Sequence, residues 1–87
     1  MIIGQNVKTE VNPVSIGHNG SVYVYFVDQV DRLIESKIEG KEHTNRFIDG
    51  DQKKKSMLKE VKTKGGDVII FYKKEESICW VSHHQHC

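Results

Sequence analysis

The chain has 87 residues, a net charge of +1, 37% hydrophobic residues and 29% charged residues. This length predicts a single domain, residues 1–87, with a small core, and the composition excludes an intrinsically disordered protein. No apolar run reaches the roughly 18 residues of a membrane-spanning helix, so no membrane partner is expected. The first residues lack the basic segment and apolar core of a signal peptide, which predicts a cytoplasmic protein.

Positive charge is concentrated in one part of the chain. Residues 51–74 hold eight lysines and three acidic residues, whereas residues 1–50 hold five basic and seven acidic residues. A lysine-rich segment can contact phosphate, although solvated lysine faces are also common on protein surfaces. The chain has no alanine and is rich in Lys, Ile and Val, which suggests the AT-rich genome of a virus, a phage or a low-GC bacterium.

Two strand signals lie in the first third of the chain. Valines alternate with polar residues over residues 7–11, which predicts a strand that ends before Pro13. The glycine-containing stretch 16–20 predicts a turn. Residues 21–27, "SVYVYFV", are the clearest strand, and the alternation of side chains puts the two tyrosines of this segment on one face.

The middle of the chain is ambiguous between helix and strand. The apolar spacing over residues 28–39 fits an amphipathic helix, but it also fits a loop followed by a short strand, "RLIESKI". Residues 41–51 have the composition of a loop with a turn at its end. Residues 52–64 again fit either element. Two helices within residues 28–64 would make the fold α+β, with an antiparallel sheet, and strands there would make it all-β.

The last part of the chain predicts a β-hairpin over residues 67–82, "DVIIFYKKEESICWVS". Trp80 is expected to be a core or edge-covering residue, with an interface anchor as the alternative. Cys79 and Cys87 are expected to be reduced thiols, because no secretory signal is seen, and they are too few for a disulfide framework. The tail "CWVSHHQHC" is dense in metal-ligating residue types, but its spacing is unlike that of a zinc finger, so no metal or other cofactor is expected.

In order along the chain, these landmarks resemble the S-one type RNA-binding domain, a five-stranded member of the OB-fold group. The resemblance covers residues 4–74 and rests on "GQNVKTEV", "GSVYVYF", "RLIESKI", "IDGD" and "EVKTKGGDVIIFYKK". It implies an all-β, OB-like five-stranded barrel, here with an extra C-terminal strand, that binds RNA. The sequence departs from the family where Lys53 and Lys55 replace alternating valines and where Glu35 replaces a histidine.

Six residues are the candidate RNA-binding residues: Tyr23, Tyr25, Arg32, Lys53, Lys55 and Lys59. The resemblance implies that Tyr23 matches the exposed aromatic residue of the second strand, with Tyr25 beside it. Stacking of a base on an aromatic side chain contributes about 1–3 kcal/mol and tolerates many sequences. The lysines would supply positive charge for the RNA backbone. Alternatively, the two tyrosines are structural and pack against the extra C-terminal strand.

Two other functions compete with RNA binding. The first is a viral or phage-borne protein-interaction module that mimics a host translation-factor domain or inhibits a host protein. The second is a ribonuclease, because "MLKEVKTKGGDVIIFYKKEESICWVSHH" is similar to the sheet of RelE-type toxins. That similarity implies two helices within residues 28–64 and a general acid or base at His83 or His84. No Walker loop, nucleophile elbow or metalloprotease motif is present, so a non-enzymatic protein is expected.

Overall fold

The computed structural model describes residues 6–82 and 84–87, which contain eight strands and no helix. The first four strands are β1 (Val14–His18), β2 (Ser21–Val27), β3 (Leu33–Glu39) and β4 (Glu42–Asp49). The other four are β5 (Lys55–Lys62), β6 (Val68–Lys74), β7 (Ser77–Val81) and β8 (Gln85–His86). The expected all-β fold is therefore confirmed. The α+β alternative is wrong, because residues 28–64 form β3, β4 and β5 instead of two helices.

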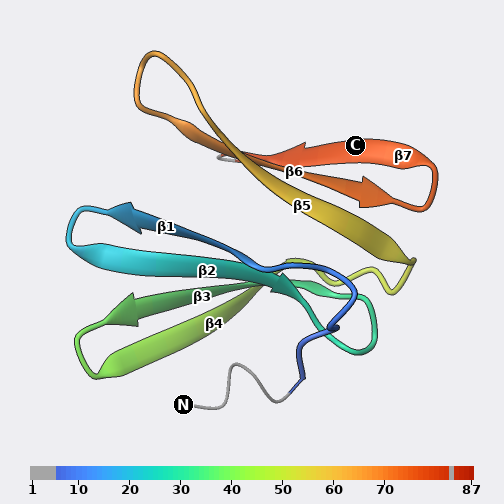
Figure 1. Ribbon diagram of the computed structural model, residues 1–87, viewed down its shortest axis with the longest axis horizontal. Helices are drawn as coiled ribbons and strands as arrows, with labels where there is room; N and C mark the ends of the chain where they lie inside the picture. Colours follow the sequence, from blue (N-terminus) through green and yellow to red (C-terminus); the bar gives the residue numbers. More distant parts are fainter. Residues whose placement is uncertain (1–5, 83) are drawn as a thin grey trace.

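The eight strands form two antiparallel sheets in which each strand pairs with its neighbour along the chain. β1–β4 make the N-terminal sheet and β5–β8 make the C-terminal sheet, which lie in the lower and upper halves of Figure 1. Both sheets are open in the part of the chain that the structure describes. The OB-like five-stranded barrel is therefore not confirmed.

Two elements of the N-terminal sheet differ from the expectation. The strand expected over residues 7–11 is absent, and this segment contributes an isolated bridge between Val7 and Asp28. Strand β1 begins instead directly after Pro13 and continues to a two-residue turn at Asn19–Gly20, whose φ values of 51° and 80° fit the hairpin turn that these residue types favour.

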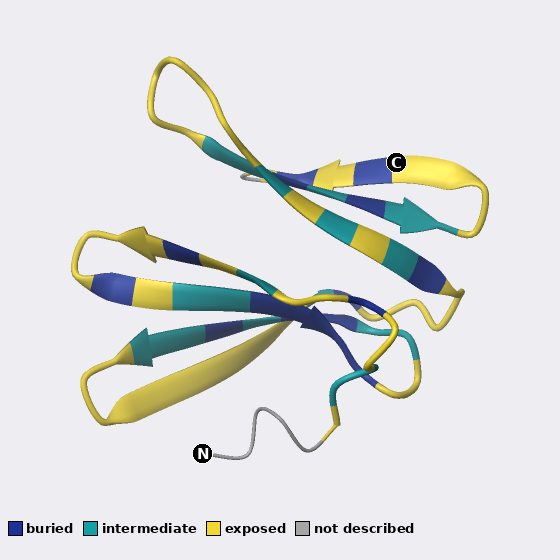
Figure 2. Ribbon diagram, in the orientation of Figure 1, coloured by how far each residue is buried: buried dark blue, intermediate teal, exposed yellow. Residues whose placement is uncertain are grey.

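The loop expected over residues 41–51 is largely strand β4. Its first six residues, from Glu42, are all exposed, as the uniform colour of this strand in Figure 2 shows. A strand at the edge of a sheet is held by backbone hydrogen bonds to one neighbour, here β3. With both faces open to solvent at this end, β4 needs no alternation of apolar and polar residues, and the sequence pattern that would have identified it is missing.

The core lies between the two sheets. One cluster contains Val27 and Leu33 of the N-terminal sheet with Tyr72 and Val81 of the C-terminal sheet. A second cluster, formed around Ile16, Tyr25 and Ile70, joins β1, β2 and β6. Each sheet therefore buries one face against the other sheet. Phe26 and Ile34 on the outer face of the N-terminal sheet are buried as well, so it is the exposed side chains of the outer faces that are available to a partner.

A polar network also connects the sheets. Asp49, at the end of β4, accepts hydrogen bonds from Tyr72 Oη (2.7 Å) and Gln85 Nε2 (2.8 Å), and its carboxylate lies 3.2 Å from Lys74 Nζ. Burial alone would raise the pKa of Asp49, but hydrogen bonds from Tyr72 and a backbone amide, and the charge of Lys55, outweigh it and lower this pKa. The Asp49 carboxylate is therefore an anion of the N-terminal sheet that contacts side chains of the C-terminal sheet.

Lys55 is the other charged member of this junction, and it is 0% exposed. Its ammonium donates hydrogen bonds to the backbone carbonyls of Asp31 (2.5 Å) and Asp51, and lies 3.9 Å from the Asp49 carboxylate. Burial lowers the pKa of the Lys55 ammonium. A buried lysine needs this set of acceptors, and Lys55 therefore holds the segment between β4 and β5 in place.

The two cysteines are joined in a disulfide between Cys79 of β7 and Cys87. The expectation of reduced thiols is therefore wrong for this structure. The reason is geometric: β8 pairs with β7 in an antiparallel register that pairs Gln85 with Val81, and this brings the end of the chain back to Cys79. The described residues include no helix that could span a membrane.

Candidate nucleic-acid interface

The outer face of the C-terminal sheet carries a row of side chains that crosses all four of its strands. Lys59 pairs with Phe71, Phe71 pairs with Trp80, and Trp80 pairs with His86. Residues that pair directly across antiparallel strands project from the same face of the sheet. We call these four residues the aromatic row. The neighbours of its members along each strand, such as Tyr72 and Cys79, point into the core.

The rings of the aromatic row are in contact and accessible. Trp80 and His86 stack with ring centroids 5.2 Å apart and an interplanar angle of 17°, and the Phe71 and Trp80 centroids are 6.3 Å apart. Trp80 is 37% exposed although it is the largest apolar side chain of the sheet. An ordered, exposed run of rings offers flat surfaces on which other planar groups can stack.

The charge on this face is positive. Lys59 begins the aromatic row, and Lys73, which pairs with Ile78, lies on the same face. Among the described residues no ion pair engages either lysine. Glu60 follows Lys59 but pairs with Ile70 on the inner face, and Glu75 and Glu76 are in the β6–β7 turn and line a hollow with Lys73. The strand positions of the outer face therefore combine rings with unpaired cations.

Exposed apolar side chains flank the aromatic row. Ile78 is 51% exposed, and Val61 and Met57 of β5 are also exposed. Met57 stands at a bulge in β5 and has a φ of 61°, which interrupts the alternation of this strand between Ser56 and Leu58. By their pairing, Val61 and Ile78 share the outer face with the aromatic row and extend the apolar surface on either side of it.

The structure places Tyr23 and Tyr25 on the inner face of the N-terminal sheet, where they pack with Ile70 of the opposite sheet. Tyr25 is 9% exposed, and its hydroxyl donates a 2.6 Å hydrogen bond to Glu35, which also pairs with Arg46. Burial and the Glu35 carboxylate raise the pKa of Tyr25. The two tyrosines thus pack against β6 and not against the extra C-terminal strand that the alternative expected, and both also line an inter-sheet cleft of about 300 Å³.

The predicted cations are spread over separate surfaces. Lys55 is buried at the junction of the sheets, and Lys53 is exposed beside a cleft that also contains Lys74. Lys59 is the one predicted residue in the aromatic row. The structure therefore does not bring the six predicted residues together on one surface.

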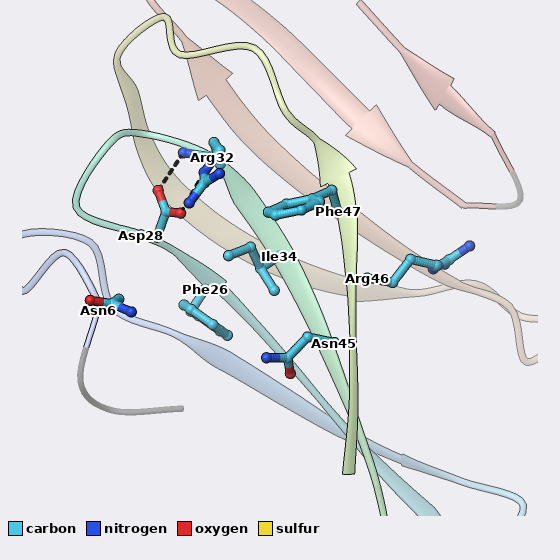
Figure 3. Close-up of a pocket in the computed structure, with 8 residues that line it drawn as sticks. All are labelled: Asn6, Phe26, Asp28, Arg32, Ile34, Asn45, Arg46 and Phe47. Atoms are coloured by element: carbon cyan, nitrogen blue, oxygen red, sulfur yellow. Dashed lines mark hydrogen bonds and ion pairs between the residues drawn. The ribbon is translucent and has the colours of Figure 1, made fainter. Parts of the chain in front are cut away.

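Arg32 lies on the outer face of the N-terminal sheet in a pocket of about 140 Å³ (Figure 3). Its guanidinium donates a 2.7 Å hydrogen bond to the buried Asp28 and lies 4.8 Å from the centre of the Phe47 ring. Phe26 and Ile34 form an apolar part of the lining. Because the charge of Arg32 is already balanced by Asp28, this pocket offers a ligand less net positive charge than the aromatic row does.

The aromatic row was missed because hydrophobicity alone does not show which face of the hairpin is buried. Phe71 and Tyr72 are adjacent, so one of them must point outward, and both are equally good strand formers. One signal was available. Phe71 and Lys73 are two residues apart in one strand and therefore lie on the same face, and the register with the neighbouring strands decides whether Lys59 and Trp80 share that face. A register that pairs these residues puts two lysines and two aromatic residues on the same face.

The histidine-rich tail provides little further chemistry in the described residues. His83 lies outside the described residues, and His84 is exposed. Cys79 and Cys87 are bonded to each other. Within residues 6–82 and 84–87, no group of three or more His, Cys, Asp or Glu side chains is arranged to hold a metal ion.

Comparisons of this chain with protein-family models, with curated proteins and with solved structures found no match. The resemblance to the S-one type domain therefore stays a prediction. Function is argued below from the residues of this chain alone.

Proposed function

We propose that this protein binds single-stranded RNA, without catalysis, on the outer face of its C-terminal sheet. The observation that carries the proposal is the aromatic row, in which Phe71, Trp80 and His86 follow Lys59 across four paired strands. Bases stack on the rings, and Lys59 and Lys73 attract the phosphates. This proposal replaces the tyrosine platform with other residues and does not require a closed barrel.

Single-stranded RNA fits this face better than a duplex does. Its unstacked bases expose flat surfaces that aromatic side chains can cover, whereas the bases of a duplex already stack on one another. The face is an open sheet and has no protruding helix that could enter a groove. Stacking tolerates many base sequences, so we expect weak sequence preference and a strong dependence on salt.

The test compares Trp80→Ala with Tyr23→Ala in titrations of a labelled single-stranded RNA at low salt, followed by fluorescence anisotropy. Loss of the Trp80 ring is expected to weaken binding about five- to 150-fold, which corresponds to the roughly 1–3 kcal/mol of one stacked base. Tyr23→Ala, on the inner face, is expected to change the affinity less than two-fold. Absence of salt-sensitive RNA binding by the unsubstituted protein would contradict the proposal.

A second candidate function is protein interaction through the same face. The exposed side chains of Met57, Val61 and Ile78 favour it, because apolar groups around an aromatic anchor are typical of protein interfaces. An Ile78→Ser variant separates the two functions. It should weaken a protein complex and leave RNA stacking on Trp80 nearly unchanged.

A further inference from the structure

Strand β8 is the shortest strand in the described residues, and it positions the last member of the aromatic row. It contains two residues, Gln85 and His86, which pair with Val81 and Trp80 of β7. A strand of two residues at the edge of a sheet has few backbone hydrogen bonds of its own. Its place on β7 therefore depends on its side chains and on the disulfide that follows it.

The side chains of β8 reach both faces of the sheet. On the inner side, Gln85 Nε2 donates hydrogen bonds to Asp49 (2.8 Å) and to the Tyr72 hydroxyl (3.1 Å). On the outer side, His86 stacks on Trp80. The disulfide from Cys87 to Cys79 closes the segment covalently. Without that bond, three weak contacts would have to offset the conformational entropy of a free chain end.

The disulfide itself can be reached from solvent. Cys79 and Cys87 both line an open cleft of about 600 Å³, together with two lysines, two glutamates and a serine: Lys53, Lys74, Glu75, Glu76 and Ser77. Cys87 is exposed, whereas Cys79 is 0% exposed. A thiolate that enters the cleft therefore meets the sulfur of Cys87 first.

We infer that the Cys79–Cys87 disulfide is a thiol–disulfide exchange site whose reduction releases β8 and takes His86 away from Trp80. The reductant is a small thiol of the glutathione class. Its thiolate attacks Cys87 Sγ, a mixed disulfide forms, and Cys79 leaves as a thiolate that takes up a proton. A second thiol then attacks the mixed disulfide, which frees the Cys87 thiol. The protein gains two electrons and two protons, and the two small thiols become one disulfide.

The consequence for RNA binding rests on the proposed function of the aromatic row. In the oxidised protein the row has three rings in contact, and Trp80 is held by a neighbour on each side. After reduction, β8 leaves the sheet edge and the row ends at Trp80. The oxidised form therefore binds single-stranded RNA more tightly than the reduced form. A cytosolic thiol pool would favour the reduced form, which binds RNA more weakly.

The experiment uses the full chain, oxidised or treated with dithiothreitol, and has three readouts. Alkylation followed by mass spectrometry counts the free thiols. Emission from Trp80, the single tryptophan of the chain, reports the loss of the stacked His86 ring. Anisotropy of a labelled single-stranded RNA gives the affinity. Reduction is expected to free both thiols, change the Trp80 emission and weaken RNA binding about five-fold or more, the equivalent of one weakly stacked ring.

Two variants make the assignment specific. Cys87→Ser should show the weaker affinity and the altered emission in both redox states. His86→Ala keeps the disulfide, so its thiols should still appear on reduction, while its affinity for RNA should not respond to the reductant. If reduction weakens the RNA affinity of His86→Ala as much as that of the unsubstituted protein, β8 does not act through His86 and the inference is wrong.

Failure of the inference and failure of the proposed function can be told apart. An oxidised protein that does not bind RNA refutes the function, and the thiol count with Trp80 emission still decides whether exchange releases β8. A disulfide that resists dithiothreitol, or a reduced protein with unchanged emission, overturns the inference. Loss of the β-sheet circular dichroism signal on reduction also overturns it, because the disulfide would then support the whole fold rather than β8.

Discussion

In the described residues the two sheets have the same number of strands and the same connectivity, but the tyrosine pair of β2 and the aromatic row of the C-terminal sheet face opposite ways. In the N-terminal sheet, Tyr23 and Tyr25 face the core, and the Tyr25 hydroxyl donates a hydrogen bond to Glu35. In the C-terminal sheet, Phe71 and Trp80 face solvent beside lysines. The difference teaches that the packed face of a strand, not its aromatic content, decides whether a ring can meet a partner.

The junction between the sheets gives the largest expected effect. Asp49→Ala would leave Lys55 and Lys74 without their shared anion, and loss of one partner of a buried ion pair costs about 3–5 kcal/mol. Urea unfolding followed by circular dichroism measures this loss. The control is Glu42→Ala on the exposed edge strand, with an expected change within roughly 0.5 kcal/mol. Equal effects in both variants would show that Asp49 does not link the sheets.

Acid is expected to weaken the same junction. Although burial opposes it, hydrogen bonds and nearby lysines lower the pKa values of both Asp49 and Asp31 in the folded protein. Their contribution to stability is therefore complete above the unfolded-state pKa, about 4, and is lost as the pH falls through the lower folded-state values.

The measurement is the midpoint of urea unfolding at neutral pH and at about pH 3, below the pKa of an unfolded aspartate. The midpoint should be lower in acid, and the decrease should be smaller for Asp49→Asn, which has no carboxyl group to protonate at this position. A midpoint that does not change with pH would mean that these carboxylates contribute no net stability.

Tyr25→Phe tests the inward role of the tyrosines with a smaller change. It removes the hydrogen bond to Glu35 and keeps the ring, so the free energy of unfolding should decrease by about 1 kcal/mol. RNA affinity should stay the same, because the hydroxyl lies on the packed face. Weaker RNA binding by this variant would instead indicate that the binding site is on the N-terminal sheet.

The smallest expected effect comes from single lysines of β5. Lys59 and Lys62 are both exposed on this strand, but Lys59 pairs with Phe71 on the outer face and Lys62 pairs with Val68 on the inner side. Lys59→Gln should lower the slope of log affinity against log salt concentration by about 1, as expected for one lost phosphate contact. Lys62→Gln is the matched control and should leave the slope unchanged. Equal slopes in the two variants would argue against phosphate contacts on the outer face.

Several strands were predictable because their residues are strong strand formers with clear boundaries. Residues 21–27 match β2, the "RLIESKI" alternative matches β3, and the hairpin over residues 67–82 matches β6 and β7. Strand β4 was not predictable, since an exposed edge strand needs no apolar alternation. The disulfide was missed because it depends on the return of β8 to Cys79, which local sequence does not encode.

The sequence by itself determined that the chain is all-β in its clearest segments, that lysines gather in its second half, and that each strand has two distinct faces. Only the tertiary structure decided which face is buried. Both faces of β2 and of β6 carry apolar or aromatic residues. The alternation of side chains along these strands is therefore compatible with burial of either face. Packing between the sheets breaks that symmetry: it buries Tyr25 and Tyr72 and leaves Phe71 and Trp80 on the surface where we propose that RNA binds.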